Sequence, residues 1–194
     1  VEENLFKYHA SCYLTHAGID AIKSLRDENN IKVEQVASVK QFVPKTHFSV
    51  CNILEPSTGL EVKFSMRHTA AMALSHINTG SLTAYDDLIA NRDDLVNLRN
   101  KVEIIDKEFH SRMQSEVIIN LTDGRSLTKF WDAGMPMADA SLQEKKLTEK
   151  FKALVVPVYG APAAEKTVSS CLKLDELEDA SSVFDFVVGQ TKSH

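Results

Sequence analysis

Apolar residues recur at helical spacing in the first hundred residues. After Thr15, the apolar residues Ile19, Ile22 and Leu25 recur at helical spacing, which predicts an amphipathic helix with Thr15 as its N-cap. Ser65 is expected to cap a second helix, because small and apolar residues over 70–74 provide a surface for close packing. Residues 81–98 are rich in Asp and Leu, and this predicts one or two short helices.

β-branched residues replace this helical pattern between residues 33 and 43. Pro44 closes the segment, so 33–43 is predicted to be a strand. A second, short strand is predicted over 101–105.

The stretch "SEVIINLTDGRSLTKFW" predicts a β-hairpin. Asp123-Gly124 lies between two strand-like runs, and this dipeptide is preferred in two-residue type I′ turns. A two-residue turn would place Phe130 on the more apolar face of the hairpin, which then needs a cover on that side. Its expected neighbours on that face are Val117, Ile119 and Leu121.

The pattern changes after Trp131, where Gly134 and Pro136 form a break. Only helical patterns follow, over 142–155, 163–174 and a last piece that ends near Val188. Because strands and helices mix only in the first part, we predict an α+β fold. It comprises a two-layer α/β domain over 1–133, with a small, mainly antiparallel sheet, and a C-terminal helical segment over 134–194.

Composition excludes several classes of protein. The 194 residues are 43% hydrophobic and 25% charged, with a net charge of −5, which is typical of a globular protein. A binder of nucleic acid or of a membrane surface would show a basic stripe, and the sequence has none. No apolar run approaches the roughly 20 residues that span a bilayer.

The cysteines predict a reducing compartment. There are three of them, widely spaced and without a CxxC motif. An odd, scattered set does not make a disulfide framework, so we expect reduced thiols and a cytoplasmic protein.

The sequence starts at Val1 in the middle of a pattern, without an initiator Met or a signal peptide. We therefore expect a fragment of a larger protein, which can carry only part of a site.

Lys7, His9, Cys12 and His16 fall close together near the start of the chain. His9, Cys12 and His16 have side chains that bind metals, but a structural zinc site needs a fourth ligand and a helix start at Thr15 would separate the three. With no CxxC or HExxH motif nearby, the sequence predicts no metal site.

The same residues could instead handle an anion. His16 would occupy the first position of a helix, where unpaired N–H groups favour a carboxylate or phosphate, and Lys7 could add a positive charge. Arg67 and His68 form a similar group at the start of the next predicted helix. On charge pattern alone, solvated surface charges and a partly buried histidine are the simpler interpretation.

Three stretches in order resemble the second half of the MmgE/PrpD family. They are "FKYHASCYLTHAGIDA", "LEVKFSMRHTAAMAL" and "VIINLTDGRSL", and the resemblance runs from about residue 4 into the 170s. The family includes 2-methylcitrate dehydratase, cis-aconitate decarboxylase and iminodisuccinate epimerase.

The resemblance implies a parent chain with two domains. An N-terminal helical domain would precede an α/β lid, here residues 1–133, and the helices of 134–194 would return to pack on the helical domain. The active site would lie in the cleft between the domains, with part of its acid–base machinery outside this sequence. The resemblance further implies a homodimer, a di- or tricarboxylate substrate, and no metal or organic cofactor.

The resemblance also implies roles for individual residues. Lys7 matches an active-site lysine, which would clamp a carboxylate or act as a general acid, and His16 matches a histidine that would bind a carboxylate or donate a proton. Cys12 falls where relatives have cysteine or histidine and would line the pocket. The sequence departs from the family at His9-Ala10, where proline is frequent. The substrate-binding candidates are His9, Cys12, Arg67 and His68.

We therefore expect the lid half of a cofactor-independent lyase or isomerase, similar to 2-methylcitrate dehydratase and inactive by itself. The alternative is a non-catalytic module for carboxylate binding or oligomerisation. Family membership alone does not choose between dehydration, decarboxylation and epimerisation.

Overall fold

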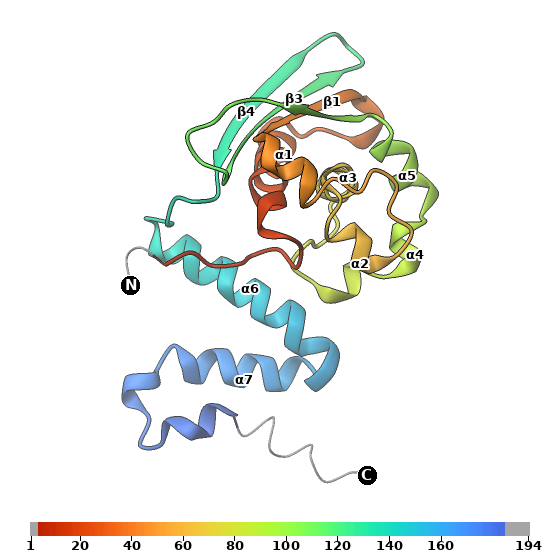
Figure 1. The fold of residues 1–194 in the computed structure, drawn as a ribbon. Coiled ribbons are helices and arrows are strands. Elements are labelled where there is room, and N and C mark those ends of the chain that lie inside the picture. The colour runs from red at the N-terminus through yellow and green to blue at the C-terminus, as the bar shows by residue number, and fades with distance from the viewer. Residues whose placement is uncertain (1–3, 185–194) are drawn as a thin grey trace. The chain divides into compact units, whose positions relative to one another are not determined.

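The structure is a computed structural model that describes residues 4–184 (Figure 1). These residues form two compact units that divide between Met137 and Ala138. We call them the N-terminal unit and the C-terminal unit.

The N-terminal unit contains a four-stranded sheet in the order β2-β1-β3-β4. β1 pairs in parallel with β2 and antiparallel with β3, and β3 pairs antiparallel with β4. The sheet is therefore mixed, with two antiparallel pairs and one parallel pair, in an α+β arrangement. The strands are β1 (Val36–Val43), β2 (Val102–Asp106), β3 (Gln114–Leu121) and β4 (Ser126–Asp132).

Helices cover one face of this sheet. Figure 1 shows α1 (His16–Asn29) and α3 (Met66–Leu74) on the same side of the strands, and both helices pack against them. Ile19 and Ile22 of α1 are buried in the core with Ile119 of β3. Three short helices complete the crossover between the parallel strands β1 and β2, which needs a long connection. They are α2 (Gly59–Val62), α4 (Asp87–Ala90) and α5 (Asp93–Arg99).

The predicted helix starts are confirmed, but only one has the predicted cap. The Ser65 hydroxyl accepts a hydrogen bond from the His68 N–H at 3.2 Å. Thr15 precedes α1 without capping it, because its hydroxyl donates to the Cys12 carbonyl at 2.8 Å. A 3₁₀ turn (Tyr13–Thr15) comes first, and the His16 N–H donates to the Tyr13 carbonyl. The expectation of an unpaired N–H at His16 was therefore wrong.

The predicted strands are present with shifted ends. The strand predicted over 33–43 begins at Val36, since Val33–Gln35 form a 3₁₀ turn. The strand predicted over 101–105 is β2, one residue later in the chain.

The hairpin forms at the predicted place with a different register. The Leu121 N–H donates to the Arg125 carbonyl at 2.8 Å, so the loop contains three residues and ends at Gly124, whose φ is +90°. A slip of one residue moves every side chain of β4 to the other face. Phe130 therefore pairs with Glu116 on the open face, where it is 50% exposed, and its predicted place on the apolar face was wrong.

As far as Phe184, where the described residues end, the C-terminal unit contains two helices and two 3₁₀ turns, as the helical patterns after Pro136 predict. Gly160, with φ +83°, joins α6 (Ala140–Tyr159) to α7 (Ala161–Cys171). The turns are Leu174–Glu176 and Ala180–Phe184. The predicted end near Val188 lies outside the described residues. In the part of the chain that the structure describes, no helix has the length and apolar character needed to cross a membrane.

Candidate functional site

The structure brings two of the predicted site residues together at the start of α1. The His9 and His16 rings meet edge to face, with centroids 4.8 Å apart and planes at 72°. Tyr13 stacks on His16 at 4.5 Å. His9 and His16 are both buried, so this pair is an interior feature of the N-terminal unit. We call it the α1 histidine pair, because His16 begins α1 and His9 packs against it.

Both ring nitrogens of His9 have partners within the chain. Nε2 lies 3.2 Å from Oδ1 of Asp20, and Nδ1 lies 2.7 Å from the hydroxyl oxygen of Thr79. The Lys23 ammonium donates to the same hydroxyl at 2.8 Å. His9 is thus held by α1 and by the loop that follows α3.

His16 is a neutral ring in this environment. It is 2% exposed, and its Nε2 has no hydrogen-bond partner among the described residues. Burial, and then the neighbouring His9, lower the pKa of His16 to about 3, although Asp20 and a hydrogen bond to the Ser11 backbone act in the opposite direction. At neutral pH the ring can accept or donate a hydrogen bond, but it carries no charge.

Lys7 and two phenols lie near the histidine pair. Lys7 is exposed, and its charge contributes to the lowered pKa of His16. Partial burial, followed by the charge of Asp20, raises the pKa of both Tyr8 and Tyr13. Both phenols are therefore protonated at neutral pH, and the Tyr13 hydroxyl donates to the Ala133 carbonyl at 2.8 Å.

Cys12 belongs to a small apolar cluster with Cys51 and Met66. Burial, and then the adjacent Cys12, raise the pKa of Cys51 to about 12, so its thiol stays protonated. His9, Cys12 and His16, whose side chains could bind a metal, are therefore divided between two environments. Within residues 4–184, no group of three or more His, Cys, Asp or Glu side chains is arranged to hold a metal ion.

Arg67 and His68 are placed in a second group. Arg67 donates from Nε to the Val102 carbonyl at 2.9 Å, at the start of β2. His68 is fully buried, and neither ring nitrogen has a hydrogen-bond partner in the described part of the chain. Burial, followed by the charge of Arg99, lowers the pKa of His68 to about 4. Arg99 itself is only 6% exposed and donates to the Pro56 carbonyl.

Sequence reasoning missed four residues around these histidines. Asp20 and Lys23 follow His16 by one and two helical turns, so helical spacing alone could have found them. Thr79 lies 56 positions after Lys23, and no local pattern marks it. Arg99 ends a short Leu-containing helix, and nothing in its local sequence signals burial.

The sequence model of the MmgE/PrpD C-terminal domain matches residues 9–174. This chain belongs to the MmgE/PrpD family. The family is associated with enzymes of the lyase and dehydratase type, and the match concerns its C-terminal domain. No curated protein matches the sequence.

The MmgE/PrpD match covers most of the candidate residues. It begins at His9 and includes the α1 histidine pair, Cys12, Arg67 and His68. Lys7 lies two residues before the first matched position.

Proposed function

We propose that this chain is the lid half of a cofactor-independent lyase or isomerase that acts on di- or tricarboxylic acids, similar to 2-methylcitrate dehydratase. The observation that carries the proposal is the α1 histidine pair, with the Lys7 charge beside it, in a domain of the MmgE/PrpD family. Lys7 and His16 are the proposed catalytic residues.

The charges fit such a reaction. Loss of a proton or of CO2 next to a carboxylate builds negative charge, and a fixed cation stabilises this charge best where water is excluded. Lys7 is exposed and would clamp a substrate carboxylate. His16 is neutral and would form a hydrogen bond to the substrate, because a ring with a pKa of about 3 carries no proton to give up as an imidazolium.

The other groups would position the substrate or complete the cleft. Cys12, Arg67 and His68 would contribute to binding, whereas both ring nitrogens of His9 are engaged within the chain. The remaining acid–base groups would come from an N-terminal helical domain of the same parent protein, in a cytoplasmic homodimer.

The test compares the parent protein with this chain alone. Each is incubated with 2-methylcitrate, citrate, cis-aconitate or iminodisuccinate, and the products are followed by NMR. We expect the parent to convert one acid, with turnover lowered at least about tenfold in Lys7→Gln and His16→Gln, a change of roughly 1.4 kcal/mol or more in the barrier. The chain alone should convert none.

Lys40→Gln is the matched control, since Lys40 is an exposed lysine on a strand. Its turnover should equal that of the unchanged parent. Full turnover in both the Lys7 and His16 variants would contradict their proposed roles. A folded parent that converts none of the four acids would contradict the lyase or isomerase.

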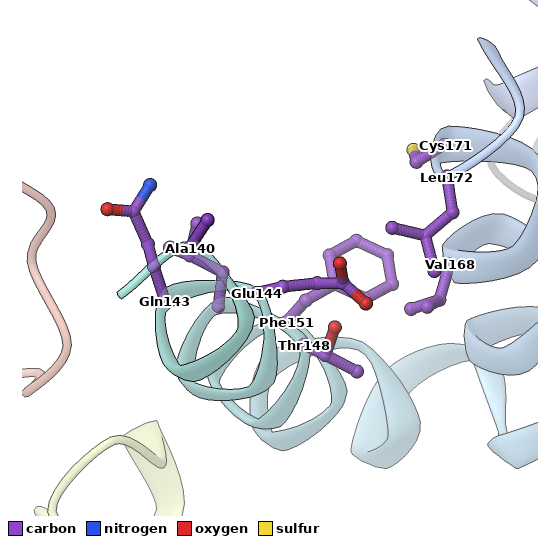
Figure 2. Close-up of a pocket in the computed structure, with 9 residues that line it drawn as sticks. Ala140, Gln143, Glu144, Thr148, Phe151, Val168, Cys171 and Leu172 are labelled. Carbon is purple, nitrogen blue, oxygen red and sulfur yellow. The ribbon is translucent and has the colours of Figure 1, made fainter. Parts of the chain in front are cut away.

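The C-terminal unit supports a second candidate, a module for assembly. An apolar groove of about 350 Å³ runs between α6 and α7, and Figure 2 shows Phe151 of α6 pointing toward Val168 of α7 across it. Neither helix buries a large apolar side chain. Exposed apolar side chains in this unit are Leu142, Val156, Val158, Leu172, Leu174 and Phe184.

Exposed apolar surface of this kind favours association. We expect the chain alone to self-associate in sedimentation velocity experiments, and Leu172→Ser with Leu174→Ser to reduce this association. A chain that stays monomeric at high concentration would exclude the assembly module.

A further inference from the structure

Four side chains from three segments form a line of hydrogen bonds beside His16. The Lys23 Nζ lies 2.8 Å from the Thr79 hydroxyl oxygen, which lies 2.7 Å from Nδ1 of His9. Nε2 of His9 lies 3.2 Å from Oδ1 of Asp20. The line therefore begins at a cation and ends at an anion.

The chemistry of the two ends fixes the direction of the two outer bonds. An ammonium group can only donate, and a carboxylate can only accept. The Thr79 oxygen accepts from Lys23, so its single proton is available for Nδ1 of His9. Asp20 requires a proton on Nε2 of His9, and in a neutral ring Nδ1 then accepts the Thr79 proton.

We infer that Lys23, Thr79 and Asp20 are positioning residues that hold His9 as the neutral Nε2–H tautomer against His16. The inference concerns the site of the proposed function and rests on that function only for its consequence in catalysis. The hydrogen-bond chain itself is a property of the folded N-terminal unit.

The fixed His9 ring lies against His16. The two ring centroids are 4.8 Å apart, and Nε2 of His16 has no hydrogen-bond partner among the described residues.

The charge of Lys23 favours a neutral His9. Its ammonium donates to the Thr79 hydroxyl that faces Nδ1 of His9, and a nearby positive charge disfavours an imidazolium. A neutral tautomer also avoids a buried positive charge against the His16 ring.

NMR spectroscopy tests the inference without any substrate. Long-range ¹H–¹⁵N correlation spectra of the ¹⁵N-labelled chain at pH 7 distinguish protonated from unprotonated ring nitrogens, and His9→Gln and His16→Gln assign the two rings. We expect His9 as a single Nε2–H tautomer. A doubly protonated His9, or an Nδ1–H His9, would overturn the inference.

Substitutions of Thr79 test the chain of bonds. Thr79→Val removes the donor to Nδ1 and should turn the single His9 tautomer into a mixture, whereas Thr79→Ser should restore the single tautomer. Thr69→Val is the matched control, because Thr69 is equally buried and its hydroxyl donates within α3. An unchanged His9 signal in folded Thr79→Val would refute the role of Thr79. If this variant does not fold, the spectrum of the unchanged chain still decides the tautomer.

The enzymatic consequence is measured separately in the parent. Thr79→Val should lower turnover at saturating substrate with little change in KM, and Thr79→Ser should retain turnover. An inactive parent with the expected His9 tautomer would contradict the proposed function and leave the hydrogen-bond chain in place. An active parent with the wrong tautomer would contradict the chain alone.

Discussion

The two units bury their helices to very different degrees. α1 has 14 residues and buries most of one side, including Ile19, Ile22 and Leu25. α6 is longer, with 20 residues, but none of them is buried in the structure described, and α7 buries only Ala164 and Thr167. Both regions have helical patterns in their sequences. The comparison shows that such a pattern predicts a helix and does not tell what covers its apolar side.

The difference in burial also decides which unit contains histidines with lowered pKa values. Burial is the main cause of the lowered pKa values of His16 and His68, and among the described residues the packed N-terminal unit provides it. His16 and His68 are buried there, while residues 138–184 contain no histidine. The candidate site is therefore a property of the unit that has a core.

The largest difference between the two units is expected in how their stability depends on pH. The folded pKa values of His16 and His68, about 3 and about 4, lie below the ordinary value of 6.5. Between 6.5 and the folded pKa values, the unfolded state therefore binds more protons than the folded state. Stability then falls as the pH falls from 6.5 through 4. At about 1.4 kcal/mol per pKa unit, each ring contributes on the order of 3 kcal/mol of loss by pH 4.

Denaturant titrations at several pH values measure this loss. Fluorescence of Trp131, the single tryptophan, reports on the N-terminal unit, and far-ultraviolet circular dichroism reports on both units. His68→Leu should make the dependence on pH shallower. A Trp131 transition that does not move between pH 7 and pH 4 would contradict the buried neutral histidines.

Removal of a core side chain should have the next largest effect. Ile22→Ala deletes a fully buried side chain beneath the sheet and should lower the free energy of unfolding by about 2–5 kcal/mol. Leu172→Ala, at an exposed position of the C-terminal unit, is the control and should change it by less than about 0.5 kcal/mol. Similar losses for the two variants would break the contrast between the units.

A substitution at Gly160, which joins α6 to α7, should have a smaller effect on stability. Gly160 has φ +83° and ψ 162°, a region that side chains with a Cβ rarely adopt. Gly160→Ala should therefore cost about 1–3 kcal/mol in the C-terminal unit and loosen the helix pair. Limited proteolysis should cut between the helices faster, with the Trp131 transition unchanged. Resistance equal to that of the unchanged chain would contradict the strained joint.

The smallest effect is expected for the ion pair between α6 and α7. Nζ of Lys152 lies 2.7 Å from Oε1 of Glu165, and the Lys152 and Glu165 side chains are 35% and 63% exposed. Lys152→Met should change stability by less than about 0.5 kcal/mol, and the difference should vanish at high salt. A loss above about 1 kcal/mol would mean that this pair, and not the apolar groove, holds the two helices together.

Much of the local structure could be predicted from neighbouring residues. The starts of α1 and α3, the Ser65 cap and the position of the hairpin all depend on local hydrogen bonds and on local apolar spacing. The hairpin register could not be predicted in this way. Asp123-Gly124 fits both a two-residue and a three-residue loop, and a difference of one residue decided the face of Phe130.

The candidate site could be predicted only in part. The short spacing of His9 and His16 predicted that they could act together, and the structure places their rings in contact. Thr79 could not be predicted, because it lies 70 positions from His9, with β1 and α3 between them in the chain. The roles of Lys7 and His16 in catalysis stay predictions.

The sequence by itself determined the family, the α+β class and the helical character of the C-terminal unit. These depend on residue types and on spacings within a few turns of chain. Only the tertiary structure decided that His16 and His68 are neutral, that Phe130 faces outward and that Thr79 is bound to His9. Burial and hydrogen bonding between distant segments set these properties, because desolvation depends on what packs around a side chain and not on its neighbours in the sequence.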